Sequence, residues 1–128
     1  MREILFRGKL RGGRWAEGNL EVKKDFFCII TPDDTPLGCY GQVDPDTVGQ
    51  YTGLTDKNGT KIFEGDIIYG YLGNGLRKEA GVVVFDDGCW EVHNHVGRWL
   101  ADLYDVNKPE VISNIHDNPE LLEARHAE

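Results

Sequence analysis

Cysteine and histidine side chains that could bind a metal ion fall in the second half of the sequence, among them Cys89, His93, His95 and His116. Thiolate sulfur and imidazole nitrogen are common zinc ligands, and residues two apart on a strand share one face, so His93 and His95 could reach one ion. The spacing matches neither Cys-x-x-Cys nor His-Glu-x-x-His, the patterns that make such an interpretation specific. We therefore assign no metal site and no cofactor. A metal-dependent enzyme using His93, His95 and His116 remains an alternative.

No catalytic nucleophile is recognisable in the sequence. Ser113 is the only serine, and the Gly-x-Ser-x-Gly pattern of serine hydrolases is absent around it. The cysteines have no basic neighbour that would activate a thiol. The carboxylates Glu64, Asp66, Asp86 and Asp87 fall at turns, where hydrogen bonds to backbone amides explain them better than acid–base catalysis does. We expect a protein that is not an enzyme.

The N-terminal segment is basic, although the chain as a whole is acidic. Up to Lys24 there are seven basic and three acidic residues, a net charge of +4, so the remainder carries −12 of the total of −8. One interpretation is a solvated surface. Another is weak binding of single-stranded nucleic acid, with Trp15 stacking on a base and cations on phosphate, namely Arg7, Lys9, Arg11 and Arg14. The acidic remainder disfavours strong duplex binding.

The aromatic side chains suggest binding to another protein. Small barrels often bind through an aromatic-lined groove, and this chain has more aromatic residues than the inside of such a barrel needs. Each could instead belong to the core. We take as binding candidates Tyr51, Tyr69, Tyr71, Trp90 and Trp99.

The elements that must position these side chains are short strands. Segments rich in β-branched and aromatic residues, many of them alternating with polar ones, predict strands near residues 4–7, 26–31, 48–54, 67–71, 80–85, 89–96 and 111–115. Trp99, Leu100 and Leu103 are expected to cap the open end of a barrel. Asn118 followed by Pro119 and Glu120 predicts a short C-terminal helix.

Turn signals separate the strands. Asp56 to Gly59 and Asp86 to Gly88 are typical of tight turns, because Asn and Gly tolerate positive φ. Asp44 to Thr47 predicts a turn or a single helical turn. The glycines at 70, 73 and 75 indicate a bulge, a barrel corner or the start of a loop. Residues 32–45 hold three prolines and read as a surface connection.

These patterns predict a mainly β fold, a small antiparallel SH3-like barrel with an N-terminal β-hairpin unit and a short C-terminal helix. We expect the hairpin unit and connection over residues 1–44 and the barrel with its helix over residues 45–128, although the two could behave as one domain. A chain of 128 residues can bury a core without disulfides.

Three ordered blocks closely resemble the YopX family, small proteins of bacteriophages and prophages. The central block is Gln50 to Gly59 followed by Ile62 to Ile68, the opening block is Arg2 to Lys9 with Trp15 after it, and the closing block is Val111 to Leu122. The resemblance implies a mostly β, oligomeric protein with a small barrel. It carries no catalytic residue over to this chain.

The expected function is therefore that of a phage or prophage accessory protein, a homo-oligomeric module that binds a host or phage protein. Nucleic acid is a less favoured partner. Three cysteines, Cys28, Cys39 and Cys89, cannot all pair within one chain, and the sequence shows neither a leader nor a run long enough to cross a bilayer. We expect free thiols and a cytoplasmic location in the bacterial host cell.

Overall fold

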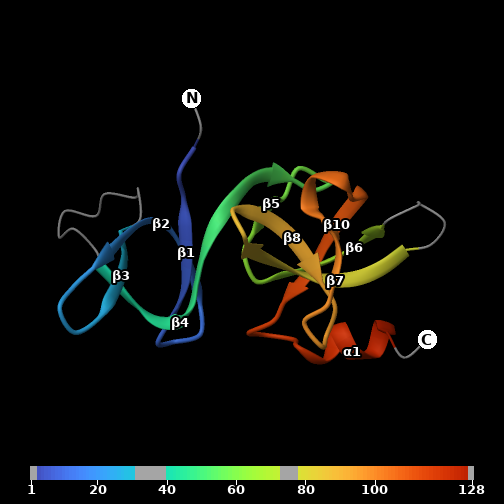
Figure 1. The fold of residues 1–128 in the computed structure, drawn as a ribbon. Helices are drawn as coiled ribbons and strands as arrows, with labels where there is room; N and C mark the ends of the chain where they lie inside the picture. Colours follow the sequence, from blue (N-terminus) through green and yellow to red (C-terminus); the bar gives the residue numbers. More distant parts are fainter. Residues whose placement is uncertain (1–2, 31–39, 73–77, 127–128) are drawn as a thin grey trace. The chain divides into compact units, whose positions relative to one another are not determined.

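The computed structural model describes residues 3–30, 40–72 and 78–126. The chain forms two compact units, Met1–Gly53 and Leu54–Glu128 (Figure 1). Cys39, most of the proline-containing connection and the loop expected at Gly73 to Gly75 lie outside the described residues. Residues 44 and 45, between which the sequence predicts a boundary, lie inside one long strand.

The first unit is a ring of antiparallel strands. They are β1 (Phe6–Leu10), β2 (Trp15–Val22), β3 (Phe27–Ile30) and β4 (Tyr40–Thr55). Each strand pairs with the next, and β4 also pairs with β1, which closes the ring (Figure 1). Closing a small sheet on itself removes its free edges.

The turn expected at Asp44 to Thr47 is a bulge inside β4. Arg7 pairs with Gly49 and Lys9 with Asp44, so one residue of β1 faces four residues of β4. The Thr47 hydroxyl donates to the carbonyl oxygen of Asp44 at 2.6 Å and accepts from the backbone N–H of Lys9 at 2.8 Å. These bonds replace ladder bonds that the bulge interrupts, so the strand continues instead of turning.

The core of this unit is small. Ala16, Ile29 and Val43 are buried together, with five half-buried apolar side chains packed around them: Phe6, Leu10, Leu20, Phe27 and Val48. Gly8 lies so close to Val43 that a Cβ on Gly8 would sit 2.8 Å from the Val43 Cβ. Glycine therefore permits the strands to approach each other at this point.

The second unit contains the remaining elements. They are β5 (Lys61–Phe63), β6 (Asp66–Tyr71), β7 (Lys78–Asp86), β8 (Cys89–His93), β9 (Trp99–Asp102), the 3₁₀ turn η1 (Leu103–Asp105), β10 (Asn107–Asn114) and α1 (Glu120–His126). β5 pairs with the end of β4, and the other strands form an antiparallel sheet in the order β10-β6-β7-β8-β9.

This sheet is buried on both faces. Ile68, Val83 and Val92 belong to a cluster on one face, together with Ile62, Leu72, Ala101, Leu103 and Val106. Ile67 and Val82 lie on the other face with Ala80 and Leu122, the last of which comes from α1. Because neighbouring residues of a strand point to opposite faces, this explains why β6 and β7 read as nearly continuous apolar runs.

Two aspartates hold the turns of the central block. Both turns were predicted from sequence, and Asp66, but not Asp56, was assigned to hydrogen bonds with backbone amides. The Asp56 carboxylate accepts hydrogen bonds from the backbone N–H groups of Asn58 (2.8 Å), Thr60 (2.9 Å) and Val111 (3.0 Å). Burial by itself would raise the pKa of Asp56, but these three amides and the nearby Lys57 outweigh it and lower the pKa below its usual value.

Asp66 has a comparable role in the second turn. Its side chain is 1% exposed and accepts a hydrogen bond from the backbone N–H of Phe63 at 2.7 Å. Between them Gly65 has a φ of 92°, a conformation that favours glycine. The expectation that Asp66 belongs to turn architecture is confirmed.

Gly70 marks a bulge, although the extra residue is in the neighbouring strand. Tyr69 pairs with Glu110 and Tyr71 with Asn107, so Gly70 alone faces Lys108 and Pro109 of β10. Lys108 has a φ of 54°. A Cβ at Gly70 would lie 3.1 Å from the Pro109 Cα, so the bulge requires glycine opposite it.

The expected fold class is confirmed: the protein is mainly β, antiparallel, with an N-terminal β-hairpin and a short C-terminal helix. The ring of paired strands lies in β1 to β4, whereas the sequence suggested a barrel over residues 45–128. Trp99 and Leu100, which were expected to cap a barrel end together with Leu103, lie in strand β9, and Leu103 lies in η1. Within the described ranges, none of the helices has the length and apolar character needed to cross a membrane.

Candidate functional site

The five aromatic candidates lie in different environments. Tyr51, in the first unit, is 9% exposed and counts as core. Tyr69 and Tyr71 are half-buried on one face of β6, and the Lys78 ammonium lies 5.6 Å and 5.4 Å from their ring centroids. Trp90 packs against the cluster on the opposite face of the same sheet. Tyr69 and Tyr71 therefore do not share a face with Trp90.

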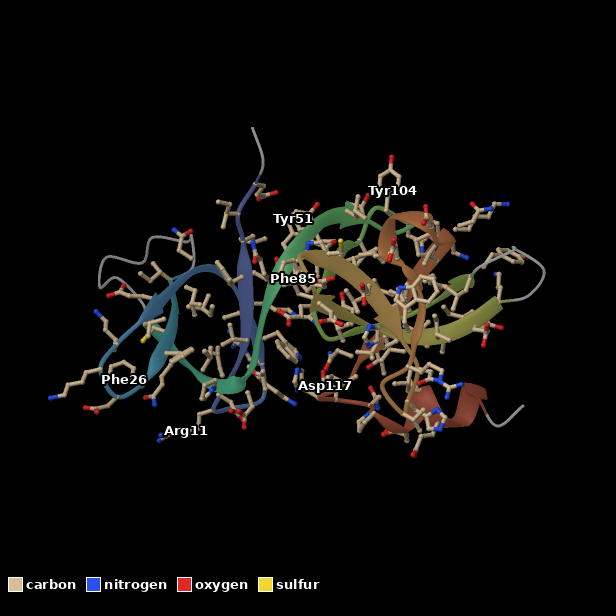
Figure 2. The ribbon with its side chains drawn as sticks, in the orientation of Figure 1. Arg11, Phe26, Tyr51, Phe85, Tyr104 and Asp117 are labelled. Atoms are coloured by element: carbon tan, nitrogen blue, oxygen red, sulfur yellow. The ribbon has the colours of Figure 1, made fainter. Side chains whose placement is uncertain are left out.

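Other exposed aromatics accompany them in the second unit. Phe85 is 54% exposed (Figure 2), and its ring meets the ring of Trp90 edge to face with centroids 4.8 Å apart. Trp99 is 55% exposed, and its indole N–H donates to an Asp102 carboxylate oxygen at 3.2 Å. Sequence reasoning missed Phe85 because a phenylalanine inside an apolar strand is usually core.

Tyr104 is the most exposed large apolar side chain of the described residues. It is 84% exposed and projects from η1 into solvent (Figure 2). It borders a shallow depression of about 180 Å³ whose other lining residues are mostly apolar: Leu54, Thr55, Ile62, Leu103, Val106 and Pro109. Sequence reasoning missed Tyr104, since the available signal was a tyrosine in the short segment from Asp102 to Asp105.

Four basic residues of the first unit, Arg7, Lys9, Arg11 and Arg14, lie in the β1–β2 hairpin. The Arg7 Cζ lies 4.8 Å from the Trp15 ring centroid, and the Lys9 Nζ lies 5.9 Å from it. Arg11, whose side chain points outward, and Arg14 occupy the connecting turn (Figure 2). The Trp15 ring thus already has two cations close to it.

A depression of about 440 Å³ opens beside this hairpin. Its lining includes Lys9 and Arg11 together with the acidic Asp44, and it is completed by Leu10, Gly13, Gln42, Val43 and Pro45. The two cations could hold an anionic group, while the carboxylate of Asp44 opposes one.

The three histidines of the metal alternative are not brought together. β8 ends at His93 rather than at Val96, so His93 and His95 do not share a strand face as expected. The Asn94 side chain accepts hydrogen bonds from the N–H groups of Val96 (3.0 Å) and Arg98 (2.9 Å), which turns the chain. Such Asx turns end a strand where apolar alternation alone predicts that it continues.

His116 lies in a second turn governed by an asparagine. The Asn114 side chain accepts hydrogen bonds from the N–H groups of His116 (3.0 Å) and Asp117 (2.9 Å), directly after β10. Among the histidines, cysteines and carboxylates that the structure describes, the group with ligand atoms close enough to share an ion contains His93 but neither His95 nor His116.

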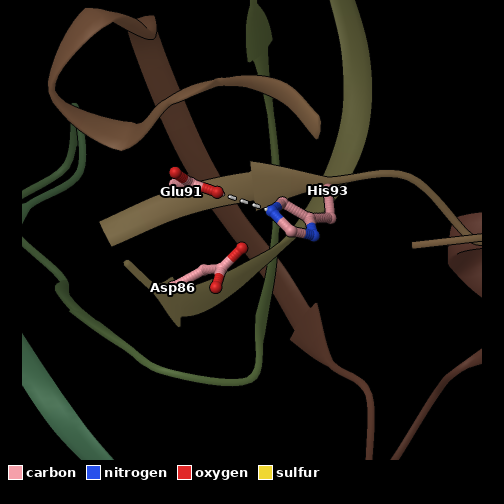
Figure 3. Close-up of side chains that lie close together, drawn as sticks. All are labelled: Asp86, Glu91 and His93. Carbon is pink, nitrogen blue, oxygen red and sulfur yellow. Dashed lines mark hydrogen bonds and ion pairs between the residues drawn. The ribbon is translucent and has the colours of Figure 1, made fainter. Parts of the chain in front are cut away.

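That group consists of Asp86, Glu91 and His93 (Figure 3). One ligand atom from each residue lies within 4.8 Å of the other two, and His93 Nε2 is 2.8 Å from a Glu91 carboxylate oxygen. The sequence assigned Asp86 to a turn and gave no role to Glu91. The turn at Asp86 to Gly88 was predicted, but the closeness of Glu91 and His93 to Asp86 depends on the register of β7 with β8, to which the prediction did not extend.

Comparison with known proteins places this chain in a family. The family model described as "YopX protein" matches residues 14–123. The chain belongs to the YopX family. The identification made from the three sequence blocks is confirmed.

Two solved structures resemble this YopX-family chain along nearly its whole length. Protein EF1440 from Enterococcus faecalis is 26% identical, with a TM-score of 0.54, and the match covers 95% of this chain and 99% of that one. Protein yopX from Bacillus subtilis is 18% identical, with a TM-score of 0.58 and the same coverage of 95% and 99%. The second likeness supports the fold alone. The comparison with curated protein sequences gives no match.

Proposed function

We propose that this YopX-family protein is a phage or prophage accessory protein that acts as a non-enzymatic, homo-oligomeric protein-binding module. The observation that carries the proposal is the exposed Tyr104 beside the apolar depression of the second unit. Its partner is a protein of the bacterial host or of the phage.

The physical argument rests on the free energy of covering an exposed aromatic ring. A tyrosine that is 84% exposed gains little from folding, whereas its burial by a partner removes a large apolar area from water. Tyrosine is enriched at interface centres because it combines a rigid apolar ring with a polar hydroxyl. The depression lined by Leu54, Ile62 and Val106 can accept an apolar side chain of the same partner.

An affinity pull-down from lysate of a host carrying the active phage tests the proposal. The wild-type protein, Tyr104→Ala and Phe26→Ala are compared with and without nuclease, and bound proteins are identified by mass spectrometry. Phe26 is a suitable control because it is an exposed aromatic, at 40%, in the other unit. Protein binding to this face predicts a nuclease-resistant partner that Tyr104→Ala loses and Phe26→Ala keeps. Equal recovery by all three would contradict it.

Light scattering coupled to size exclusion tests the homo-oligomer. The chain mass is 14.4 kDa, and an assembly predicts an integral multiple of this mass. A particle of one chain mass at high protein concentration would exclude the oligomeric part of the proposal and leave the binding part standing.

A second candidate function is weak binding of single-stranded nucleic acid by the β1–β2 hairpin. It is favoured by the depression lined by Lys9 and Arg11 and by the cations near Trp15. A purely electrostatic contact of this kind weakens steeply as salt is added. Asp44 at the rim limits the affinity for phosphate.

Fluorescence anisotropy with labelled single-stranded DNA and RNA at low salt tests this candidate. Binding should fall on Arg11→Ala and remain on Lys61→Ala, a cation of the second unit. Absence of any anisotropy change at low salt would eliminate it.

A further inference from the structure

The β7–β8 hairpin places two carboxylates and an imidazole on one face of the second sheet. Asp87 (φ 51°) and Gly88 (φ 78°) form the two-residue turn. The register that follows pairs Asp86 with Cys89, Val84 with Glu91, and Val82 with His93. Since alternate residues of paired strands share a face, the side chains of Asp86, Glu91 and His93 lie on the same face of the hairpin.

The three ligand atoms are close enough to bind one ion. They lie within 4.8 Å of one another, with one oxygen from each carboxylate and one nitrogen from the imidazole (Figure 3). A tetrahedral zinc ion bound at about 2.0 to 2.2 Å by oxygen and nitrogen separates its ligand atoms by roughly 3.3 to 3.6 Å. The His93 Nε2 and the Glu91 oxygen, 2.8 Å apart, need to separate only slightly to admit such an ion.

Burial makes part of this group rigid and leaves part of it accessible. The side chains of Glu91 and His93 are 16% and 15% exposed, while Asp86 is exposed at the end of β7. Next to them, Val82 is buried and Val84 half-buried in the cluster on this face. Two ligands are therefore held by packing, and solvent can reach the third side.

The charge balance of the group favours a cation. Glu91 and His93 are hydrogen-bonded to each other. This bond does not compensate the negative charge of Asp86, and the carboxylates of Asp86 and Glu91 repel each other at this distance. Asp102, which pairs with Glu91 in β9, adds another acid beside the group. A divalent ion neutralises the carboxylates and uses the imidazole nitrogen as a ligand.

The geometry points to a divalent transition-metal site at Asp86, Glu91 and His93, of a kind suited to zinc. Mixed oxygen and nitrogen ligands favour zinc and related first-row ions over magnesium or calcium, which prefer oxygen alone. Three protein ligands leave room for a water molecule as the fourth. This site shares no residue with the proposed binding surface at Tyr104. An experiment that excludes one of the two proposals therefore leaves the other unaffected.

The test uses the full chain, purified without a histidine tag and freed of metal by dialysis against a chelator. Zn²⁺ binding is measured by calorimetry, and Co²⁺ is added to report the coordination geometry through its visible absorption. The wild-type protein should bind about one ion per chain. Glu91→Gln and His93→Gln should each weaken binding by at least about tenfold, since each removes a direct ligand.

Asp86→Asn and Asp87→Asn provide a matched pair. Both change one exposed carboxylate at the same hairpin, and asparagine tolerates the positive φ of residue 87. Only Asp86 has an oxygen in the group, so Asp86→Asn should weaken binding and Asp87→Asn should not. Because Asp86 is exposed, its substitution tests the site without disturbing the core.

Two further variants separate this site from other metal-binding groups. Cys89→Ser and His95→Gln should bind Zn²⁺ as the wild type does. The proposal is overturned if the wild type takes up no Zn²⁺, if Asp86→Asn and Asp87→Asn behave alike, or if binding is lost with Cys89→Ser and retained with Glu91→Gln.

Discussion

The two units of this protein are both antiparallel β structures, but they bury apolar side chains in different ways. In the first, four strands close a ring and share a small core around Ala16, Ile29 and Val43. In the second, one sheet carries a cluster on each face, so that Val82 and Val83 are both buried. In this second unit Asp86 lies at the end of β7 and Tyr104 in η1, whereas Glu91 lies inside β8, where its side chain is 16% exposed.

The largest effect should come from truncating the two cores. Ile68→Ala in β6 and Ile29→Ala in β3 each remove a side chain that is 0% exposed, at a cost of about 2 to 5 kcal/mol. Ile68→Ala should lower the free energy of unfolding more than Ile29→Ala. The cluster around Ile68 contains more buried side chains than the cluster around Ile29, so it can close less of the cavity that the substitution leaves. Native-state hydrogen exchange of the amides in β6 and β3 measures both losses. A smaller loss at Ile68 would contradict the comparison of the cores.

A pair of glycine substitutions sharpens the comparison. A Cβ at Gly70 would meet the Pro109 Cα at 3.1 Å and the Asn107 carbonyl oxygen at 3.2 Å, whereas at Gly41 the one short contact is with the terminal methyl of Leu10, at 2.4 Å. Backbone atoms cannot move aside, but a leucine tip can rotate. Gly70→Ala should therefore lower the free energy of unfolding by about 1 to 3 kcal/mol, and Gly41→Ala should lower it much less. Urea unfolding of both variants measures the two changes. Equal costs would show that the first unit is packed as rigidly as the bulge beside Gly70.

Asp56→Asn should lower the free energy of unfolding by a smaller, pH-dependent amount, about 1 kcal/mol at neutral pH. The Asp56 carboxylate accepts three backbone amides, while Asp44 in the first unit accepts one, from Asp46 at 3.0 Å. Because the pKa of Asp56 is lowered in the folded state, its stabilisation is fully present above the unfolded-state pKa of about 3.9. It is lost as the pH falls through the folded value.

Unfolding of wild type and Asp56→Asn between pH 7 and pH 2 measures this effect. The two curves should converge at the acid end. Asp44→Asn serves as the control and should differ little from wild type near neutral pH. A difference between wild type and Asp56→Asn that persisted at pH 2 would indicate a role of Asp56 other than that of its ionised carboxylate.

The smallest effects on stability are expected at the exposed side chains Tyr104 and Arg11. Tyr104→Ala and Arg11→Ala should each change the free energy of unfolding by no more than about 0.5 kcal/mol. A thermal melt of each variant measures this directly. A loss well above this value would mean that the side chain supports its own unit, and the corresponding binding proposal would lose its main argument.

Local chemistry made much of the fold predictable from sequence. The turns at Asp56 to Gly59 and at Asp87 and Gly88, and the helix that begins just after Pro119, all depend on residues close together in the chain. The closure of the ring between β1 and β4 was not predictable in this way, because it pairs residues about 33 to 44 positions apart. The end of β8 was misplaced because one asparagine side chain overrode the apolar pattern.

The candidate sites were less predictable than the fold. His93 belonged, with His95 and His116, to the metal alternative considered from the sequence, but its neighbours in the structure, Asp86 and Glu91, come from the cross-strand register and not from the histidines nearby in sequence. The exposure of Tyr104 depends on where η1 leaves the sheet, and residue type does not determine that. Sequence patterns indicate which face of a strand is apolar but not which polar residues two strands bring together.

The hydrogen bonds of Asp56 also bear on the order in which the second unit assembles. Two of its amide partners, Asn58 and Thr60, are within four residues, but the third belongs to Val111, 55 residues later. Lys57 likewise donates its backbone N–H to the carbonyl oxygen of Pro109 at 2.9 Å. A chain emerging from the ribosome can thus form this turn early, yet the turn gains its full set of bonds only when β10 arrives. The most local motif of the sequence is completed by one of its longest-range contacts, and such contacts slow folding.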